Sequence, residues 1–463
     1  MGLAEARQMR NRTSSAAWAP PARYRRRGSM QLSRRQLLIR GGGLAIAAAG
    51  LWPLDRLAAG IRGARAVVPG AETLRKCISL GGPGSLRQDG HPDDYRLWGN
   101  REYIRDISGT RWVKLWVSWY DLQEEVVFPP ASRADSWRHL NRAPGGQSWL
   151  RRLDAQMRAA NDDRLGVILS IHHAYPTWAS GAIGADPVDP GKPAEHKLPL
   201  DVSPDDPWGW FVAYLIARYR KGSRPNPVGP DGAPIGAGVG YDPLFGNPDG
   251  AAIDALEICN EPNHLAWPQE GVVETTAQMI RSATQLSAVW GGTPILAPAT
   301  SDYPDAPARN ARGTTGTVWS DFTLGVLHAL AGHRAEVPLR WSHHNYRDVR
   351  LGTSRAQDVL AMLHGAGWQS DLGPLWLTEG GLDLGRRAVS PAALRLQARS
   401  IERSFRETSR LGGVYLWTQH TISDKPENDF KSGLRDDFRW GRGPGPPRPA
   451  WEVWRDLPGA LTA

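Results

Sequence analysis

Eight short apolar runs, separated by longer amphipathic stretches, constrain the fold of this chain more than any other feature of its sequence. The runs have the length and the β-branched and aromatic content of strands that are buried on both faces. The expected strands lie near residues 76–80, 111–117, 166–172, 253–261, 293–298, 338–344, 374–379 and 412–418. Helical patterns are found near 147–160, 206–220, 271–290, 319–331, 354–366, 390–410 and 449–456. Strands that alternate with helices indicate a parallel sheet, and eight of them predict a (β/α)8 barrel.

We expect one domain to span residues 67–463, although 463 residues could hold two or three average domains. No glycine-rich dinucleotide fingerprint follows the first strand, which counts against an open doubly wound sheet. Three stretches, 181–207, 222–250 and 421–449, are rich in Pro, Gly and Asp. Such long loops in a compact domain are usually functional or mobile, and none of them has the composition of a linker to a second domain.

The first 66 residues are strongly basic and have the features of an export signal. They contain 13 Arg and no Lys, with only Glu5 and Asp55 acidic, which gives a net charge of +11. The segment Ser33-Arg34-Arg35-Gln36-Leu37-Leu38 resembles the twin-arginine signature. A mildly apolar segment follows, and Ala64-Arg65-Ala66 matches a small-x-small cleavage site. We therefore expect residues 1–66 to be a twin-arginine signal and basic leader, with a disordered basic tail as the alternative.

This leader also determines what the charge of the chain means. Subtracting +11 from the net charge of +9 leaves −2 for the remaining residues, so the basic pI does not indicate a nucleic-acid partner. Arg40 and Asp55 enclose only 14 uncharged residues, against the roughly 20 that a spanning helix needs. We expect the mature protein to be secreted, or to lie in the periplasm or cell envelope, without stable membrane insertion. The sequence leaves the oligomeric state open.

The two cysteines, Cys77 and Cys259, both lie in apolar strand-like runs and are most simply buried thiols. A disulfide between them would need a close approach that the sequence cannot establish. Neither of the two adjacent histidine pairs, His172-His173 and His343-His344, has a spacing typical of metal ligands, and we expect no metal and no cofactor.

Two of the expected strands end in a glutamate. The run Ala255-Leu256-Glu257-Ile258-Cys259 leads into Asn260-Glu261-Pro262, and Leu375-Trp376-Leu377-Thr378 leads into Glu379. In a (β/α)8 barrel the carboxyl ends of the strands meet at one face, where catalytic residues lie. Two carboxyl groups at that face suggest acid/base and nucleophilic work on one bond. Strict alternation would put Asn260 and Glu261 on opposite faces, so we expect a bend or bulge there.

Six segments, in order along the chain, carry a resemblance to a known family. They are Gly109 to Trp119, Val167 to His173, Glu257 to Pro262, His344-Asn345-Tyr346, Thr378-Glu379-Gly380 and Tyr415-Leu416-Trp417. Together they resemble the motifs of strands two, three, four, six, seven and eight of the cellulase-like glycoside hydrolases of family 5, which are barrels. Family 39 and other members of the same clan share the Asn-Glu-Pro and the later Glu, so the resemblance is to the clan more than to one family.

The resemblance implies a secreted retaining β-glycoside hydrolase that acts on an oligo- or polysaccharide. It assigns Glu261 as the acid/base and Glu379 as the nucleophile. Tyr346 would donate a hydrogen bond to Glu379, and Asn260 would hold the 2-hydroxyl of the sugar. A second glutamate on the fourth strand, Glu257, is interpreted as structural.

Four further positions receive a role from the same resemblance. His172 and His344 would contact the substrate or hold the carboxylates, and Trp417 would form the floor on which the reacting sugar stacks. Lys114 stands where the family usually has Arg, so it keeps the charge but loses the planar fork that holds two acceptors. This departure leaves open the hypothesis of a non-catalytic carbohydrate-binding barrel, and the long loops leave open a cell-surface interaction protein. The sequence fixes neither the sugar nor endo or exo action.

Overall fold

The structure is a computed structural model that describes the chain from residue 74 to residue 459, with gaps. The described ranges are 74–82, 84–87, 90–123, 129–142, 146–172, 175–180, 198–221, 250–264, 270–306, 308–309, 315–368, 373–385, 389–426 and 430–459. All of them belong to one compact unit, Leu54–Ala463. The expected export leader, residues 1–66, lies outside the described residues.

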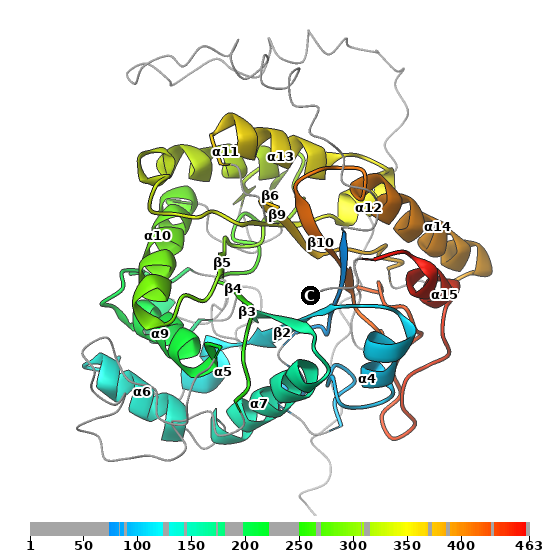
Figure 1. The fold of residues 1–463 in the computed structure, drawn as a ribbon, viewed down its shortest axis with the longest axis horizontal. Helices are drawn as coiled ribbons and strands as arrows, with labels where there is room; N and C mark the ends of the chain where they lie inside the picture. Colours follow the sequence, from blue (N-terminus) through cyan, green and yellow to red (C-terminus); the bar gives the residue numbers. More distant parts are fainter. Residues whose placement is uncertain are drawn as a thin grey trace, which may run out of the picture. The chain divides into compact units, whose positions relative to one another are not determined.

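Eight parallel strands form the sheet at the centre of this unit (Figure 1). They are β1 (Arg75–Ser79), β2 (Trp112–Val117), β3 (Gly166–Ile171), β4 (Ala255–Glu257), β5 (Ile295–Leu296), β8 (Trp341–His344), β9 (Leu375–Glu379) and β10 (Val414–His420). Their order is β5-β4-β3-β2-β1-β10-β9-β8, so the last strand pairs with the first. The expected (β/α)8 barrel is confirmed.

The barrel closes between β5 and β8 by isolated bridges instead of a continuous ladder. Leu296 pairs with Arg340 and Thr300 with His343, both in the parallel sense. The hydrogen bonds across this junction run from Ala297 N to Arg340 O at 2.8 Å, from Thr300 N to Ser342 O at 3.0 Å and from His344 N to Thr300 O at 2.9 Å. We call this junction the β5–β8 seam.

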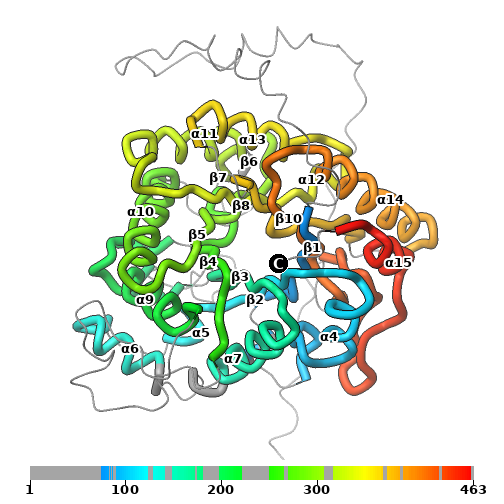
Figure 2. Tube along the Cα trace, in the orientation of Figure 1, coloured from blue at the N-terminus to red at the C-terminus, as the bar shows by residue number. Residues whose placement is uncertain are grey.

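Helices surround the barrel (Figures 1 and 2). The longer ones are α6 (Arg133–Arg142), α7 (Gly146–Asp162), α9 (Pro207–Tyr219), α10 (Val272–Trp290), α11 (Trp319–Ala329), α13 (Arg355–Gly365), α14 (Pro391–Thr408) and α15 (Pro449–Asp456). Short helical segments are α3 (Gly84–Arg87), α4 (Asn100–Glu102), α5 (Trp119–Gln123), α8 (Thr177–Ser180), α12 (Tyr346–Leu351), a π-helical turn at Tyr103–Ile107 and a 3-10 turn at Ala331–His333. A two-stranded antiparallel sheet is formed by β6 (Ala308–Arg309) and β7 (Thr315–Gly316).

Local sequence signals explain the helix boundaries. Helix α14 begins after Ser390, whose hydroxyl accepts a hydrogen bond from the backbone N–H of Ala393 at 3.2 Å, with Pro391 at the first helical position. Helix α10 ends at Gly291, which has a φ of 145°. Within the described residues, no helix has both the length and the apolar composition needed to cross a membrane.

The interior of the barrel changes from apolar to polar along the strand direction. Seven side chains form an apolar layer, namely Cys77, Trp112, Ile168, Ala255, Leu296, Trp376 and Leu416. Because side chains alternate along a strand, the residues two positions further on also face inward. On β2, β3 and β4 these residues are Lys114, Ser170 and Glu257, and all three are fully buried. The polar layer lies directly below the carboxyl ends of the strands.

The expected irregularity at the end of the fourth strand is present. Strand β4 ends at Glu257, earlier than the expected 261, and Asn260 forms only a single parallel bridge with Ala299. Glu261 has a φ of 47°, in the left-handed region that non-glycine residues rarely adopt. This turn directs both Asn260 and Glu261 into the cavity at the carboxyl end of the barrel. Both cysteines are buried and unpaired, as the simplest interpretation predicted.

Candidate active site

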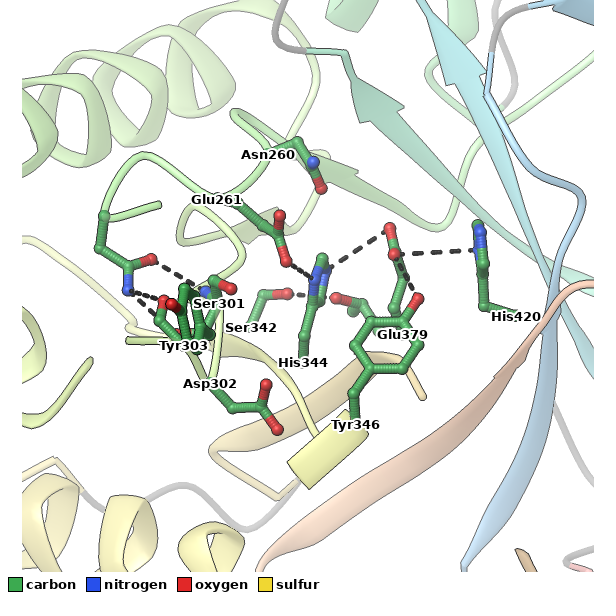
Figure 3. A network of polar contacts seen from close by, with 12 residues as sticks. Asn260, Glu261, Ser301, Asp302, Tyr303, Ser342, His344, Tyr346, Glu379 and His420 are labelled. Carbon is green, nitrogen blue, oxygen red and sulfur yellow. Dashed lines mark hydrogen bonds and ion pairs between the residues drawn. The ribbon is translucent and has the colours of Figure 1, made fainter. Parts of the chain in front are cut away.

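A cavity of about 570 Å³ opens at the carboxyl ends of the strands. It is lined by Gly82, Trp116, His172, Asn260, Glu261, His264, Ser301, Asp302, Tyr303, Tyr346, Arg347, Arg350, Glu379, Asp383, His420 and Phe430. Five residues singled out from the sequence are among them, namely His172, Asn260, Glu261, Tyr346 and Glu379, while Lys114 and His344 are fully buried next to Glu379. Figure 3 shows how the two glutamates approach each other through His344.

The Glu379 carboxylate contacts four side chains from four elements, namely Lys114, His344, Tyr346 and His420. Lys114 donates to its Oε1 at 3.0 Å, and the Tyr346 hydroxyl donates the expected hydrogen bond to its Oε2 at 2.8 Å. His420 Nδ1 lies 3.8 Å from Oε2. Burial alone would raise the pKa of Glu379, but the charges of His344, Lys114 and His420 outweigh it and hold this pKa well below its usual range. Glu379 is therefore an ionised, firmly oriented carboxylate.

Lys114 is bound between two carboxylates. Its Nζ lies 2.7 Å from Glu257 Oε2 and 3.0 Å from Glu379 Oε1, and no part of its side chain is exposed. Burial favours the neutral amine, but the two carboxylates outweigh burial and raise the pKa of Lys114. Lys114 therefore supplies a permanent positive charge directly below Glu379.

Glu257 is fully buried and makes hydrogen bonds through both of its oxygens. The Ser170 hydroxyl donates to Oε2 and the Ser342 hydroxyl donates to Oε1, each at 2.5 Å. The nearby Lys114 and His344 charges outweigh burial and lower the pKa of Glu257. With its oxygens occupied and no path to the cavity, Glu257 neutralises Lys114 and does not compete with Glu261 as an acid.

His344 connects the two cavity glutamates. Its Nδ1 lies 2.7 Å from Glu261 Oε1, and its Nε2 lies 3.5 Å from Glu379 Oε1. Burial lowers the pKa of His344, but the two carboxylates outweigh it and raise this pKa. For Glu261, burial would raise the pKa, yet the His344 charge dominates and lowers it to about 2. One proton is thus shared across the short Glu261–His344 contact, with the imidazole as its preferred site.

Asn260 presents an unsatisfied amide to the cavity. Its Oδ1 is buried, and within the described part of the chain it has no hydrogen-bond partner. A buried polar atom without a partner costs free energy unless a ligand or water satisfies it. His172, packed edge-to-face on Trp116 with ring centroids 5.8 Å apart, lines the same cavity. These groups provide polar and aromatic contacts beside the two glutamates.

The prediction that Trp417 forms the floor of the sugar site is wrong. Trp417 is fully buried and packs against Trp454, with ring centroids 5.5 Å apart, and against Phe405. Its neighbour Leu416 belongs to the barrel interior, so strand alternation directs Trp417 outward, between β10 and the helices. The residue of β10 that reaches the cavity is His420, three positions later.

Sequence reasoning missed several other cavity residues. Asp302 and Tyr303 follow β5, Arg347 and Arg350 lie on α12, and His420 ends β10. His420 could have been found by extending the alternation of β10 from Leu416. The others lie in loops or on a short helix, where no periodic pattern marks them. Among the described residues, no group of three or more His, Cys, Asp or Glu side chains is arranged to hold a metal ion.

No protein-family model matches this chain, and no curated protein matches it in sequence. Solved structures with a similar fold include the β-glycosidase of Thermosphaera aggregans, at 12% identity and a TM-score of 0.48, covering 85% of this chain and 99% of that one. Xylanase 10B of Thermotoga petrophila, solved with xylobiose, has 11% identity and a TM-score of 0.47, covering 89% and 98%. A β-glucosidase of Pyrococcus furiosus has 10% identity and a TM-score of 0.48, covering 84% and 95%. Likenesses this distant carry no weight for activity, which must be inferred from the cavity.

Proposed function

We propose that this protein is a retaining β-glycoside hydrolase, with Glu379 as nucleophile and Glu261 as acid/base. The observation that carries the proposal is the contrast between the two carboxylates. Glu379 is held ionised by Lys114 and Tyr346, whereas Glu261 lies 2.7 Å from His344 Nδ1, from which it can receive a proton. Retaining hydrolysis needs an ionised carboxylate as the nucleophile and a second carboxyl group that delivers a proton, with the two about 5–5.5 Å apart. A single imidazole that contacts both glutamates is compatible with such a compact pair.

The first step forms a covalent glycosyl-enzyme. A Glu379 oxygen attacks the anomeric carbon as the glycosidic C–O bond breaks, and the leaving oxygen takes a proton from Glu261. Because the imidazole is the preferred site of the shared proton, His344 Nδ1 passes it to Glu261 across the 2.7 Å contact as the leaving group departs. His344 is then neutral, and Glu261 is again an unprotonated base.

The second step releases the sugar. Glu261 takes a proton from a water molecule, whose oxygen attacks the anomeric carbon and displaces the Glu379 carboxylate. The proton returns to the Glu261–His344 pair, so the enzyme is unchanged after the cycle. Asn260, with its unsatisfied amide oxygen, and His172 are the proposed contacts of the reacting sugar. No metal or cofactor enters either step.

The roles of the two glutamates are tested by azide rescue. Glu261→Ala should still form the glycosyl-enzyme from a dinitrophenyl β-glycoside, because this leaving group needs no proton, and should then stall. Added azide should attack the intermediate and give a glycosyl azide with the configuration of the substrate. With Glu379→Ala, azide should attack the bare anomeric centre and give the inverted azide.

NMR spectra of the products distinguish these outcomes. The opposite pattern in the two variants would exchange the proposed roles, and inverted product from the unaltered enzyme would refute the retaining mechanism. A non-catalytic carbohydrate-binding barrel would hydrolyse no member of a panel of aryl β-glycosides. The same panel, extended to oligosaccharides, would identify the sugar and separate endo from exo action.

The proposed glycoside hydrolase family and the proposed export of the protein both rest on the sequence. We place the chain near family 5, or with a relative such as family 39, in one clan of barrel glycosidases. The proposal that it is exported by the twin-arginine route is supported by Arg34, Arg35 and the Ala64-Arg65-Ala66 site.

A further inference from the structure

Two partly exposed tryptophan side chains on the surface of the barrel unit pack on the same phenylalanine ring. Trp98 is 40% exposed and Trp440 is 47% exposed. Both pack edge-on against the buried ring of Phe438, with centroid distances of 5.3 Å and 5.2 Å. We call Trp98, Trp440 and the Phe438 ring beneath them the tryptophan platform. The segment after β10 that carries Phe438 and Trp440 runs beside α4 (Figures 1 and 2).

The backbone of Trp98 accommodates this exposure at a conformational cost. Its φ is 58°, a left-handed conformation that is an outlier for a bulky residue and that clusters at functional sites. Its indole N–H donates to Gly90 O at 3.3 Å. Gly443 leaves room for the ring, because a Cβ there would lie 2.9 Å from Trp98 Cε3. Stability alone would not favour a strained backbone that leaves a large apolar ring in water.

A short series of contacts connects the platform to the wall of the active-site cavity. Gly82 lines the cavity, and its neighbour Gly81 lies against the Asp93 carboxylate. The Asp93 N–H donates to His91 Nδ1 at 3.2 Å, and the His91 ring packs edge-on against Trp440 with centroids 6.0 Å apart. The loops involved follow β1 and β10, so platform and cavity share the carboxyl end of the barrel.

The chemistry around the rings is suited to a carbohydrate. The flat face of an indole is large and apolar, which suits the C–H face of a sugar ring, while its edges remain polar. Arg439 and Arg442 flank Trp440 in sequence, and both are exposed. Neither guanidinium forms a hydrogen bond or ion pair within the described chain, so both can donate to sugar hydroxyls or carboxylates.

We propose that the tryptophan platform is an outlying subsite for a glycan chain that extends from the active-site cavity. This inference rests on the proposed function and adds to it that the preferred substrate is long enough to reach the platform. A second copy of the chain is a poorer occupant. Stable interfaces bury about 800 Å² per partner, and here two rings stand among charged side chains.

Binding is measured by affinity gel electrophoresis with the mature protein in the Glu379→Gln background, so that polymers are not degraded. The probes are mixed-linkage β-glucan, glucomannan, xylan and carboxymethyl cellulose. The platform variants are Trp440→Ala and Trp98→Asn, because asparagine tolerates the left-handed conformation. Trp440→Phe tests rescue by a ring, and Leu396→Ala, 49% exposed on α14, is the matched surface control.

We expect at least one polymer to retard the parent protein and each platform variant to bind it about fivefold more weakly or worse. Trp440→Phe should recover much of the affinity, and Leu396→Ala should bind as the parent does. With Glu379 restored, the platform variants should keep the parental kcat/KM on an aryl glycoside and lose it on the polymer.

The outcomes separate the two proposals. Polymer binding that depends on the platform, in a protein that hydrolyses no glycoside, would support the platform and refute the proposed function. Aryl glycosidase activity with platform variants that bind like the parent would refute the platform alone. No retardation of the parent by any polymer would also refute it, as would self-association in sedimentation that both tryptophan variants abolish.

Discussion

Replacing Lys114 by methionine tests the electrostatic arrangement below the nucleophile. Methionine has a similar length but no charge, so Lys114→Met leaves two buried carboxylates, Glu257 and Glu379, without their shared cation. Removing one partner of a buried ion pair typically costs about 3–5 kcal/mol. We expect the free energy of unfolding at pH 7 to fall by that order.

The same substitution should alter catalysis in a defined direction. Lys114 is one of the charges that hold the pKa of Glu379 low, so its loss raises that pKa. The acid limb of the kcat/KM profile should move to higher pH, and kcat should fall by about 10²–10³-fold, as it does when a fixed electrostatic contact is removed. Lys114→Arg keeps the positive charge and introduces the residue that the resemblance leads one to expect at this position. This variant should retain most of the parental free energy of unfolding.

A double variant separates charge balance from orientation. Adding Glu257→Gln to Lys114→Met removes the carboxylate that lost its partner, and of the two serine hydroxyls at 2.5 Å, one can donate to the new amide oxygen and the other can accept from its NH2 group. In the double variant the free energy of unfolding should recover, while kcat should stay low. Denaturant unfolding measures the first quantity, and pH-dependent kinetics measure the second. Parental stability and an unmoved acid limb in Lys114→Met would refute the reasoning.

Three further expectations follow from other groups. Tyr346→Phe removes the 2.8 Å hydrogen bond to Glu379 and should lower kcat by about 10–100-fold, measured in single-turnover experiments, with KM little changed. Burial raises the pKa of Asp302 from 3.8 to about 7, so its contribution to stability is present below pH 3.8 and is lost as the pH rises through 7. Asp302→Asn should therefore remove a decrease in unfolding free energy of up to about 4 kcal/mol between pH 4 and 7, and an unchanged pH dependence would contradict this. Replacing Arg34 and Arg35 together by lysine should block export, and undiminished export of the double variant would refute the twin-arginine assignment.

The sequence predicted the framework because periodicity is a local signal. The helix expected at 147–160 is α7, Gly146–Asp162, and the one expected at 449–456 has those bounds in α15. The position of Glu379 at the end of a strand was likewise readable, because an apolar run stops just before it, whereas Glu261 lies four residues beyond the end of β4. A bend or bulge at Asn260 and Glu261 was expected because strict alternation would put the two side chains on opposite faces, and the structure shows it as a left-handed turn at Glu261.

What could not be predicted depends on register and on loops. Which face of β10 Trp417 occupies is decided by the pairing of β1 with β10, Cys77 opposite Thr418, and a run ending near residue 418 does not reveal it. The partners of Glu257 come from β2, β3 and β8, so only the closed barrel brings them together. Asp302 and Arg347 lie outside any periodic pattern, and their place in the cavity depends on how the loop after β5 and the short helix α12 fold.

The β5–β8 seam is joined by isolated bridges, whereas β2 and β3 form a continuous ladder, so the barrel should open more easily at the seam. Glu261 follows β4 on one side of the seam and Glu379 ends β9 on the other, while His344, on β8, contacts both. Separation of β5 from β8 would move the carboxylates of Glu261 and Glu379 apart while the surrounding helices are still folded. Hydrolytic activity should therefore be lost on heating at a temperature where circular dichroism still reports an intact fold. Amide hydrogens at Ala297 and His344 should exchange with deuterium sooner than those in the long β2–β3 ladder.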